Sequence, residues 1–143
     1  MSRTLYTRDI LRLATSIAHQ QRLADPDGSA ELRSQTCGSV VIADVILAAD
    51  GSLARLGLEI DSCALGQASA AILSAQAIGR RANEIAAVRN ALAAYLKGGA
   101  ALPDDWQQLE NLEVAQGHPG RHAAILLPYD ALITALNHAQ LAA

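Results

Sequence analysis

Cys37 and Cys63 are the two cysteines of the chain, and both stand where local backbone geometry would favour a thiolate. Cys37 opens a Cys37-Gly38-Ser39 corner just before a β pattern. Cys63 lies where a strand pattern changes to a helix pattern, in the segment Ser62-Cys63-Ala64-Leu65-Gly66-Gln67-Ala68-Ser69. The first N–H groups of a helix are unpaired and carry the positive end of its dipole, so a thiol there is suited to metal or sulfur chemistry.

From the sequence alone, the two thiols can be interpreted in two ways. Thiolates select iron–sulfur clusters, zinc and Cu(I), so any metal site would be built on Cys37 and Cys63. Their spacing in the sequence does not identify a metal. Both could instead be small buried hydrophobic residues, a common role of free cysteines. Their positions at corners favour the functional interpretation, because burial there would bring no evident packing gain.

Other candidate groups are fewer. The sequence contains no Gly-x-Ser-x-Gly elbow and no Walker-type glycine-rich loop. Glu59 falls on the exposed side of its strand pattern, which argues against a paired-carboxylate site with Asp44 or Asp61. His122, beside Arg121 and ahead of an apolar run, is either a ligand or a surface histidine, because no neighbour in the sequence would fix its tautomer.

Two alternating segments around an Asp-Gly turn predict an antiparallel hairpin over about 40–60. The turn falls at Asp50-Gly51, and the apolar residues on either side recur at every second position. We expect one face of this sheet to be buried and the other to be wet. A weaker pattern over about 31–36 is compatible with an additional strand.

Most of the remaining chain has apolar residues at helical spacing. The segments expected to be helical are 10–18, 65–78, 85–96 and a last one that begins near Pro128, with a looser connection over 102–120. Proline is favoured in the first turn of a helix, which places the start of the last one. Strands followed by helices indicate an α+β fold, with a small antiparallel sheet and helices packed on one of its faces.

Length and composition set limits on class and compartment. A chain of 143 residues fits one domain, 1–143, and is long enough to bury a core. It is 51% hydrophobic but has no Phe and one Trp, so Ala, Leu, Ile and Val must build that core. The formal charge of −3, with Lys and Arg scattered, predicts no nucleic-acid partner.

No apolar run approaches the roughly 20 residues of a membrane span, and no signal peptide is visible. We therefore expect no membrane partner and a cytoplasmic location. In that compartment two cysteines are reduced thiols or metal ligands more often than a structural disulfide.

Several short motifs occur in an order that points to a family. Thr36-Cys37-Gly38-Ser39 stands before the hairpin, and Cys63 with Ala68-Ser69 opens the next helix. The remaining matches are the opening segment from Thr4-Leu5-Tyr6 to Ile10, the helix end at Lys97-Gly98-Gly99, and Arg121 before an apolar run. Over nearly its whole length the chain resembles the iron–sulfur cluster assembly scaffold proteins of the IscU, SufU and NifU N-terminal type.

The departures from this family fall on its metal ligands. In the family, three cysteines and the Asp of a Cys-Gly-Asp segment surround the metal or nascent cluster. Here Ser39 holds the Asp position, and the third cysteine falls on Ala124, or on Ala123 with a one-residue shift. His122 matches the histidine that IscU-type members carry beside this cysteine only in the shifted register. The resemblance thus implies Cys37 and Cys63 as metal and cofactor-binding residues, with His122 as a further candidate ligand.

The function implied by the resemblance is that of a non-enzymatic scaffold or accessory protein. It would bind iron, an iron–sulfur cluster of the [2Fe–2S] type or sulfur in transit through Cys37 and Cys63. Its partners would be a cysteine desulfurase and recipient apo iron–sulfur proteins. One chain cannot supply the four cysteines that commonly hold such a cluster, so we expect a cluster bridged between the subunits of a homodimer or completed by an external thiol.

Two alternatives stay open. One is a zinc-dependent sulfur-acceptor or relay protein for a cysteine desulfurase, in which zinc holds the site and a cysteine accepts persulfide sulfur. The other is a metal-free paralogue that keeps the scaffold surface and acts only as a partner-binding module.

Overall fold

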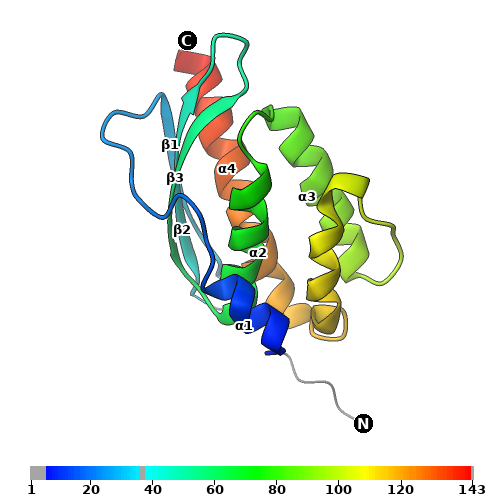
Figure 1. The fold of residues 1–143 in the computed structure, drawn as a ribbon. Helices are drawn as coiled ribbons and strands as arrows, with labels where there is room; N and C mark the ends of the chain where they lie inside the picture. The colour runs from blue at the N-terminus through cyan, green and yellow to red at the C-terminus, as the bar shows by residue number, and fades with distance from the viewer. Residues whose placement is uncertain (1–5, 36–37, 143) are drawn as a thin grey trace.

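The computed structural model describes residues 6–35 and 38–142. In chain order its elements are α1 (Arg8–Ala14), β1 (Gly28–Arg33), β2 (Val40–Leu47), β3 (Leu53–Asp61), α2 (Ala64–Gln76), α3 (Ala82–Leu96), the 3-10 segments η1 (Asp104–Ala115) and η2 (Pro119–Arg121), and α4 (His122–Ala142). The sheet forms one layer and the helices lie against one side of it (Figure 1). The predicted α+β fold is confirmed.

The sheet is antiparallel with the strand order β1-β2-β3. The hairpin predicted over about 40–60 is confirmed as β2 and β3, which pair from Val40 and Asp61 at the open end to Leu47 and Leu53 near the turn. The additional strand covers Gly28–Arg33 and so begins earlier than the predicted 31–36. Gly28 can start this strand because it lacks a side chain. A Cβ at this position would lie 2.6 Å from the backbone nitrogen of Ala139 in α4.

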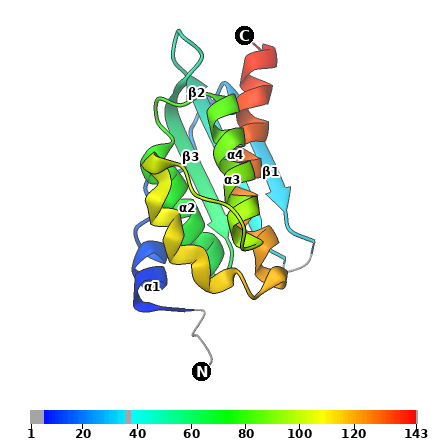
Figure 2. The same cartoon turned by 90° about the vertical axis from the view of Figure 1, so that its right-hand side faces the viewer.

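The core lies between the sheet and the helices. Helix α4 packs on β1 and β2, α2 and α3 pack against α4, and α1 packs against α2, as Figures 1 and 2 show from two sides. Small and branched aliphatic residues fill this space, with Trp106 and Tyr129 as the buried aromatic pair, their ring centroids 6.3 Å apart. Among the described helices, none combines the length and the apolar character that crossing a membrane requires.

The outer face of the sheet is less exposed to solvent than predicted. Asp44 and Gly57 are paired across β2 and β3 on that face, and both are buried. The chain between α1 and β1 covers them. A Cβ at position 57 would meet the carbonyl oxygen of Gln21, and the backbone N–H of Leu23 donates to Asp44 Oδ2 over 3.0 Å. The prediction of a wet face was therefore wrong at the centre of the sheet, because a loop packs there.

Helix α1 ends at Ala14, four residues before the predicted end at Ala18. The hydroxyls of Thr15 and Ser16 each donate to a backbone carbonyl one turn back, over 2.9 Å. Such side-chain bonds compete with the helical pattern and favour termination. The chain then turns sharply at His19, whose φ is +62°.

Helix α4 begins at His122, six residues earlier than predicted, and Pro128 lies inside it. A proline has no N–H, so the carbonyl of Ala124, four residues back, loses its helical donor. That carbonyl faces Gly66 of α2, where a Cβ would lie 3.2 Å from the Ala124 oxygen. Pro128 thus lies inside α4, where this helix packs against α2, although the sequence around Pro128 predicts the start of a helix. The connection expected over 102–120 contains the 3-10 segments η1 and η2.

Candidate functional site

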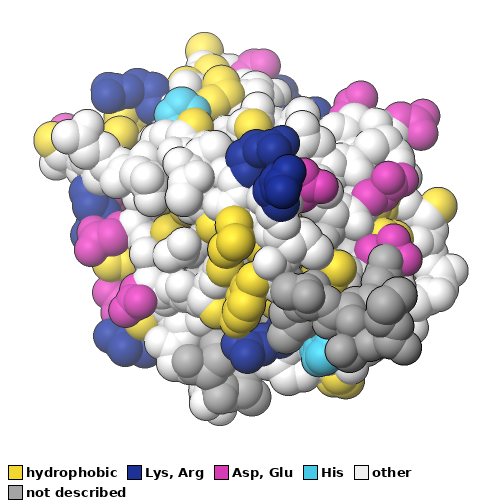
Figure 3. Space-filling model, turned by 60° about the horizontal axis from the view of Figure 1, so that its bottom comes forward, with side chains coloured by type: hydrophobic (Ala, Val, Ile, Leu, Met, Phe, Trp, Pro, Cys, Tyr) yellow, Lys and Arg dark blue, Asp and Glu magenta, His cyan; other side chains and the backbone are white. Residues whose placement is uncertain are grey.

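The sequence-predicted thiol site falls at one end of the molecule. There β2 begins, β3 ends, and α2 and α4 begin, close to α1 (Figures 1 and 2). Figure 3 turns this end toward the viewer and shows hydrophobic side chains exposed on it, beside residues drawn in grey. On α1, Leu11 is 50% exposed, and the preceding Tyr6 is 39% exposed. This end therefore combines exposed apolar surface with the ends of four elements.

Cys63 is the N-cap residue of α2, as the sequence predicts. Its backbone is extended, with φ −67° and ψ 169°, and its carbonyl accepts the first helical hydrogen bond from the N–H of Gln67 over 2.9 Å. Within the described part of the chain, the Cys63 side chain makes no capping hydrogen bond to the first turn of this helix. The thiol is free and partly exposed. It thus stands at the positive end of a 13-residue helix, within reach of a ligand from solvent.

A pair of serines lies directly beside Cys63. The hydroxyl oxygens of Ser39 and Ser62 are 2.9 Å apart, and Ser39 is buried with 4% of its surface exposed. Val40 and Asp61 form the last pair of the β2–β3 ladder, so the two serines occupy the next position along it. We did not predict this pair from the sequence. The signal was present, because counting outward equally from the Asp50-Gly51 turn places the two serines opposite each other.

The segment that carries the two third-cysteine positions packs against the first turns of α2. Ala124 is buried and Ala123 is exposed. The Ala124 carbonyl approaches Gly66, and the hydroxyl of buried Ser69 donates to the Ile125 carbonyl over 2.6 Å. Residues 123–125 therefore adjoin the helix that Cys63 caps. Both candidate positions are alanines, so neither supplies a metal ligand.

His122 is the first residue of α4 and is partly buried. Its Nε2 lies 2.8 Å from the backbone oxygen of Ala115. A carbonyl oxygen only accepts hydrogen bonds, so Nε2 must carry the proton. In the neutral ring this leaves Nδ1 with its lone pair. The partner that fixes the tautomer is thus a backbone carbonyl seven residues away, which the local sequence did not reveal.

Cys37 lies outside the described residues, at 36–37. Across residues 6–35 and 38–142, no group of three or more His, Cys, Asp or Glu side chains is arranged to hold a metal ion. The structure brings Ser39, Ser62, Cys63 and the start of α4 to the same end of the sheet. It thus leaves open the ligand set predicted from Cys37, Cys63 and His122.

The buried carboxylate of the molecule serves the fold. Asp44 has no exposed side-chain surface, and it accepts hydrogen bonds from Arg22 Nε (2.6 Å), Ser29 Oγ (2.5 Å) and the Leu23 N–H. Burial alone would raise the pKa of Asp44, but these hydrogen bonds outweigh it and hold the pKa below its ordinary value. Asp44 is thus an ionised anchor for the loop over the outer face of the sheet, with no second carboxylate in its hydrogen-bond set.

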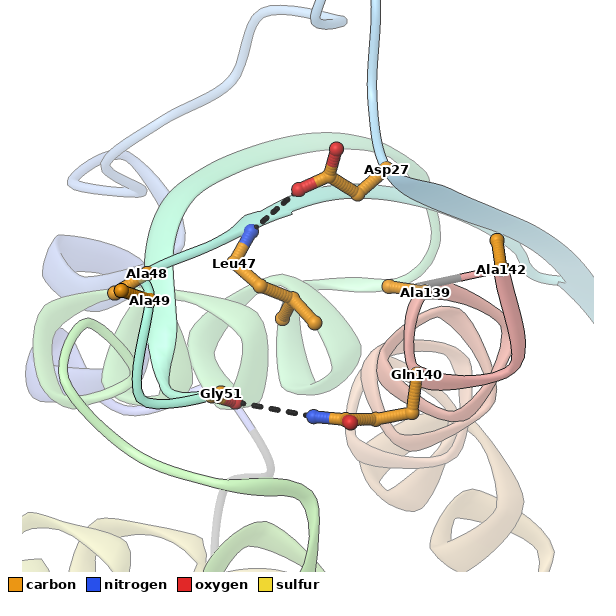
Figure 4. Close-up of a pocket in the computed structure, with 8 residues that line it drawn as sticks. All are labelled: Asp27, Leu47, Ala48, Ala49, Gly51, Ala139, Gln140 and Ala142. Carbon is orange, nitrogen blue, oxygen red and sulfur yellow. Dashed lines mark hydrogen bonds between the residues drawn. The ribbon is translucent and has the colours of Figure 1, made fainter.

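A pocket of about 320 Å³ lies at the opposite end of the hairpin, between its turn and the end of α4 (Figure 4). Asp27 Oδ2 accepts a hydrogen bond from the Leu47 N–H over 2.8 Å, and the Gln140 amide donates to the Gly51 carbonyl over 3.3 Å. Its polar groups are thus engaged in joining the hairpin to its surroundings. The described residues that line this pocket include no thiol and no imidazole, so it is a poor candidate for metal or sulfur chemistry.

Comparison with known proteins gives matches among solved structures. No protein-family model matches the chain, and no curated protein does. The N-terminal part of a nitrogen-fixing NifU-like protein from Brucella abortus superposes with a TM-score of 0.89 at 31% identity, over 97% of this chain and 96% of that one.

Two more distant structures share the fold. A protein described as a putative iron–sulfur cluster assembly scaffold for the SUF system, from Fervidobacterium islandicum AW-1, gives a TM-score of 0.83 at 20% identity, over 92% of this chain and 96% of that one. A hypothetical protein gives 0.75 at 20% identity, over 93% and 97% of the two chains. With the first match at 31% identity over nearly both full lengths, the chain belongs to the IscU/SufU/NifU-like family of iron–sulfur cluster assembly scaffold proteins.

Proposed function

We propose that this protein is an iron–sulfur cluster assembly scaffold or accessory protein. Its thiols Cys37 and Cys63 bind iron, a cluster or sulfur as cargo, with His122 as a third ligand. One observation carries the proposal: in a chain of this family, Cys63 is a free, partly exposed thiol at the positive end of α2. The chain itself performs no turnover, and its role is to hold cargo and pass it on.

The donor set limits what one chain can hold. Two thiolates and one imidazole nitrogen are soft or borderline ligands, which suit iron–sulfur species and zinc. His122 supports this role, because a metal-binding histidine commonly donates its other N–H to a carbonyl, as Nε2 does to Ala115. Ser39 offers a neutral hydroxyl in place of the family's carboxylate. A single chain thus offers three strong donors, and a fourth position stays open.

The fourth ligand of the site must come from outside the chain. A [2Fe–2S] cluster commonly has four cysteine ligands, which two copies of this chain would supply through Cys37 and Cys63 of each. An external thiol could complete the site of a single chain. In either case the site releases its cargo when that outside ligand is replaced by one from a recipient apoprotein.

The sulfur comes from a cysteine desulfurase in this proposal. The Cys63 thiolate attacks the outer sulfur of a persulfide on the desulfurase, so a new S–S bond forms as the old one breaks. The sulfur and its proton pass to Cys63, and the desulfurase cysteine leaves as a thiolate. The partly exposed position of Cys63 suits this transfer, and Leu11 and Tyr6 provide exposed apolar surface near the same end of the molecule.

Zinc-dependent sulfur relay is the second candidate. It is favoured by the proposed donor set of two thiols and one imidazole, which would leave one position open, the pattern of zinc sites that exchange a ligand. In that case zinc is resident, and the sulfur passes through a cysteine without a cluster being built. The metal-free partner-binding paralogue is a third possibility, favoured by the alanines at both third-cysteine positions.

A desulfurase-coupled assay separates these candidates. The anaerobic protein, with Cys37→Ser and Cys63→Ser variants, is incubated with a cysteine desulfurase, cysteine, Fe²⁺ and a reductant that supplies the electrons needed to convert persulfide sulfur to sulfide. We expect visible charge-transfer absorbance and acid-labile sulfide on the wild type, both lost in each variant. A colourless zinc protein that carries persulfide by mass spectrometry would instead establish the relay. A protein with neither metal nor persulfide, whose desulfurase binding is the same in the variants, would leave only the partner-binding role.

A further inference from the structure

The open end of the β2–β3 hairpin is joined by side chains after its backbone ladder stops. Val40 and Asp61 are the last paired residues, and the hydroxyls of Ser39 and Ser62 then meet at 2.9 Å. Ser39 is buried, so the contact is shielded from competing water. In the sequence, Ser39 follows Cys37 by two positions, and Ser62 directly precedes Cys63. The hydrogen bond therefore connects the residue directly before Cys63 to Ser39, the residue directly before β2.

Ser62 also packs against the first turn of α2, at Gly66. A Cβ on Gly66 would overlap the hydroxyl oxygen of Ser62, and it would lie 3.2 Å from the carbonyl oxygen of Ala124. The Ser62 side chain thus occupies the space that a larger residue at position 66 would fill. This packing brings together the end of β3, the start of α2 and the start of α4. These are the segments that present Cys63, His122 and the third-cysteine position.

We propose that the Ser39–Ser62 hydroxyl pair is a positioning device for the Cys63 thiol. It holds the Cys63 end of α2 against the segment that follows Cys37, and Gly66 makes room for it. Neither serine acts as a ligand. Their hydroxyls set where Cys63 stands and limit how often the first turn of α2 opens. This inference rests on the proposed function for its metal readout, and its first test requires no metal.

The first test measures local opening in the apoprotein. The N–H of Gln67 donates to the Cys63 carbonyl, so its hydrogen exchange reports opening of the turn that Cys63 caps. Ser39→Ala and Ser62→Ala should each speed this exchange roughly two- to tenfold, the range for loss of one net hydrogen bond. The effect of the double variant should be smaller than the sum of the two single effects, because the bond between the two hydroxyls can be lost only once.

Ser52→Ala is the matched control. Ser52 is also a buried serine, and its hydroxyl donates to Asp50 over 2.6 Å at the other end of the same hairpin. Its loss should lower global stability without a selective change at Gln67. Unchanged Gln67 exchange in both Ser39→Ala and Ser62→Ala, or additive effects in the double variant, would overturn the inference.

The second test uses cobalt as the metal probe. Thiolate-to-cobalt charge-transfer absorbance should report weaker binding, by roughly two- to tenfold, in Ser39→Ala and Ser62→Ala but not in Ser52→Ala. Cobalt affinity that is the same in all four proteins would overturn the positioning role and leave the proposed function intact. Faster, non-additive Gln67 exchange in the serine variants, together with a wild type that binds no cobalt, would do the opposite: it would support the positioning of Cys63 and contradict the proposed metal function.

Discussion

Asp44 holds the loop that covers the outer face of the sheet. Its carboxylate has no exposed surface, whereas its partner Arg22 keeps 48% of its side chain exposed. A buried charge is tolerated only when hydrogen bonds replace its water, and Asp44 receives them from Arg22, Ser29 and the Leu23 N–H. The loop before β1 is therefore tied down at its centre by one anion.

We expect Asp44→Asn to lower the free energy of unfolding by about 2 kcal/mol, because it replaces charge-assisted hydrogen bonds with neutral ones. Urea denaturation at neutral pH measures this. Glu59→Gln, an exposed position on the same hairpin, is the control and should change stability by less than about 0.5 kcal/mol.

The Asp44 effect should also depend on pH. Its folded pKa lies below its ordinary value of about 4, so the unfolded chain takes up a proton first as the pH falls. The stabilisation is complete above that ordinary value and is lost as the pH drops through the folded pKa. The difference between wild type and Asp44→Asn should therefore shrink toward pH 3. A difference that is constant from pH 7 to pH 3 would contradict this assignment.

A further prediction concerns the nitrogen through which His122 can bind a metal ion. Its Nε2 is held by the Ala115 carbonyl, so a metal ion could bind only through Nδ1 of the neutral ring. On titration with Zn²⁺, nitrogen NMR should show a large change at Nδ1 while Nε2 stays protonated. Zinc binding that saturates with no change at His122 would remove this residue from the ligand set and leave the two cysteines.

Strand β1 packs tightly against α4 at Gly28, where a Cβ would overlap the carbonyl oxygen of Ala135. A methyl group there would lie 2.6 Å from the Ala139 nitrogen, so Gly28→Ala must push α4 away from the sheet. We expect a loss of roughly 1 to 3 kcal/mol in the free energy of unfolding, the usual cost of overpacking. Gly99→Ala is the control, because nothing lies within 4 Å of a Cβ there. Equal stability of the two variants would show that the contact is not tight in solution.

The elements differ in how far the sequence could predict them. The hairpin was predictable because its alternation and its Asp-Gly turn are local signals that agree with each other. Cys63 at a helix N-terminus was predictable for the same reason. The start of α4 was not, because Pro128 is a good first-turn residue locally. In the folded molecule Pro128 lies inside α4, and the Ala124 carbonyl lies beside Gly66 of α2, a tertiary contact that the local sequence does not contain.

The candidate site as a whole was predictable only in outline. The position of Cys63 and the absence of a third cysteine follow from the sequence. The Ser39–Ser62 contact depends on the register of the hairpin, and the His122 tautomer depends on a carbonyl in a separate 3-10 segment. The serine contact could have been found by counting outward from the Asp50-Gly51 turn, whereas the His122 contact joins two separate elements, about which local patterns carry little information.

Because one chain has too few cysteines to hold a cluster, we expect cluster binding to change the oligomeric state of the protein. If a cluster is bridged by two copies, anaerobic reconstitution with iron and sulfide should convert the apoprotein to a species of twice its mass. Removal of the cluster with a chelator should reverse this, and Cys63→Ser should stay at the apoprotein mass. Light scattering during size-exclusion chromatography measures the change. A cluster-bearing monomer formed with no added thiol would contradict the bridged arrangement.

The cargo itself is the most direct test of the scaffold role. Iron, acid-labile sulfide and zinc should be measured per chain after anaerobic purification and reconstitution of the wild type, Cys37→Ser and Cys63→Ser. For a [2Fe–2S] cluster shared by two chains we expect about one iron and one sulfide per chain, with both absent from each variant. A wild type that binds no iron and sulfide even after reconstitution, or one whose iron and sulfide survive in both variants, would contradict cargo binding by these thiols.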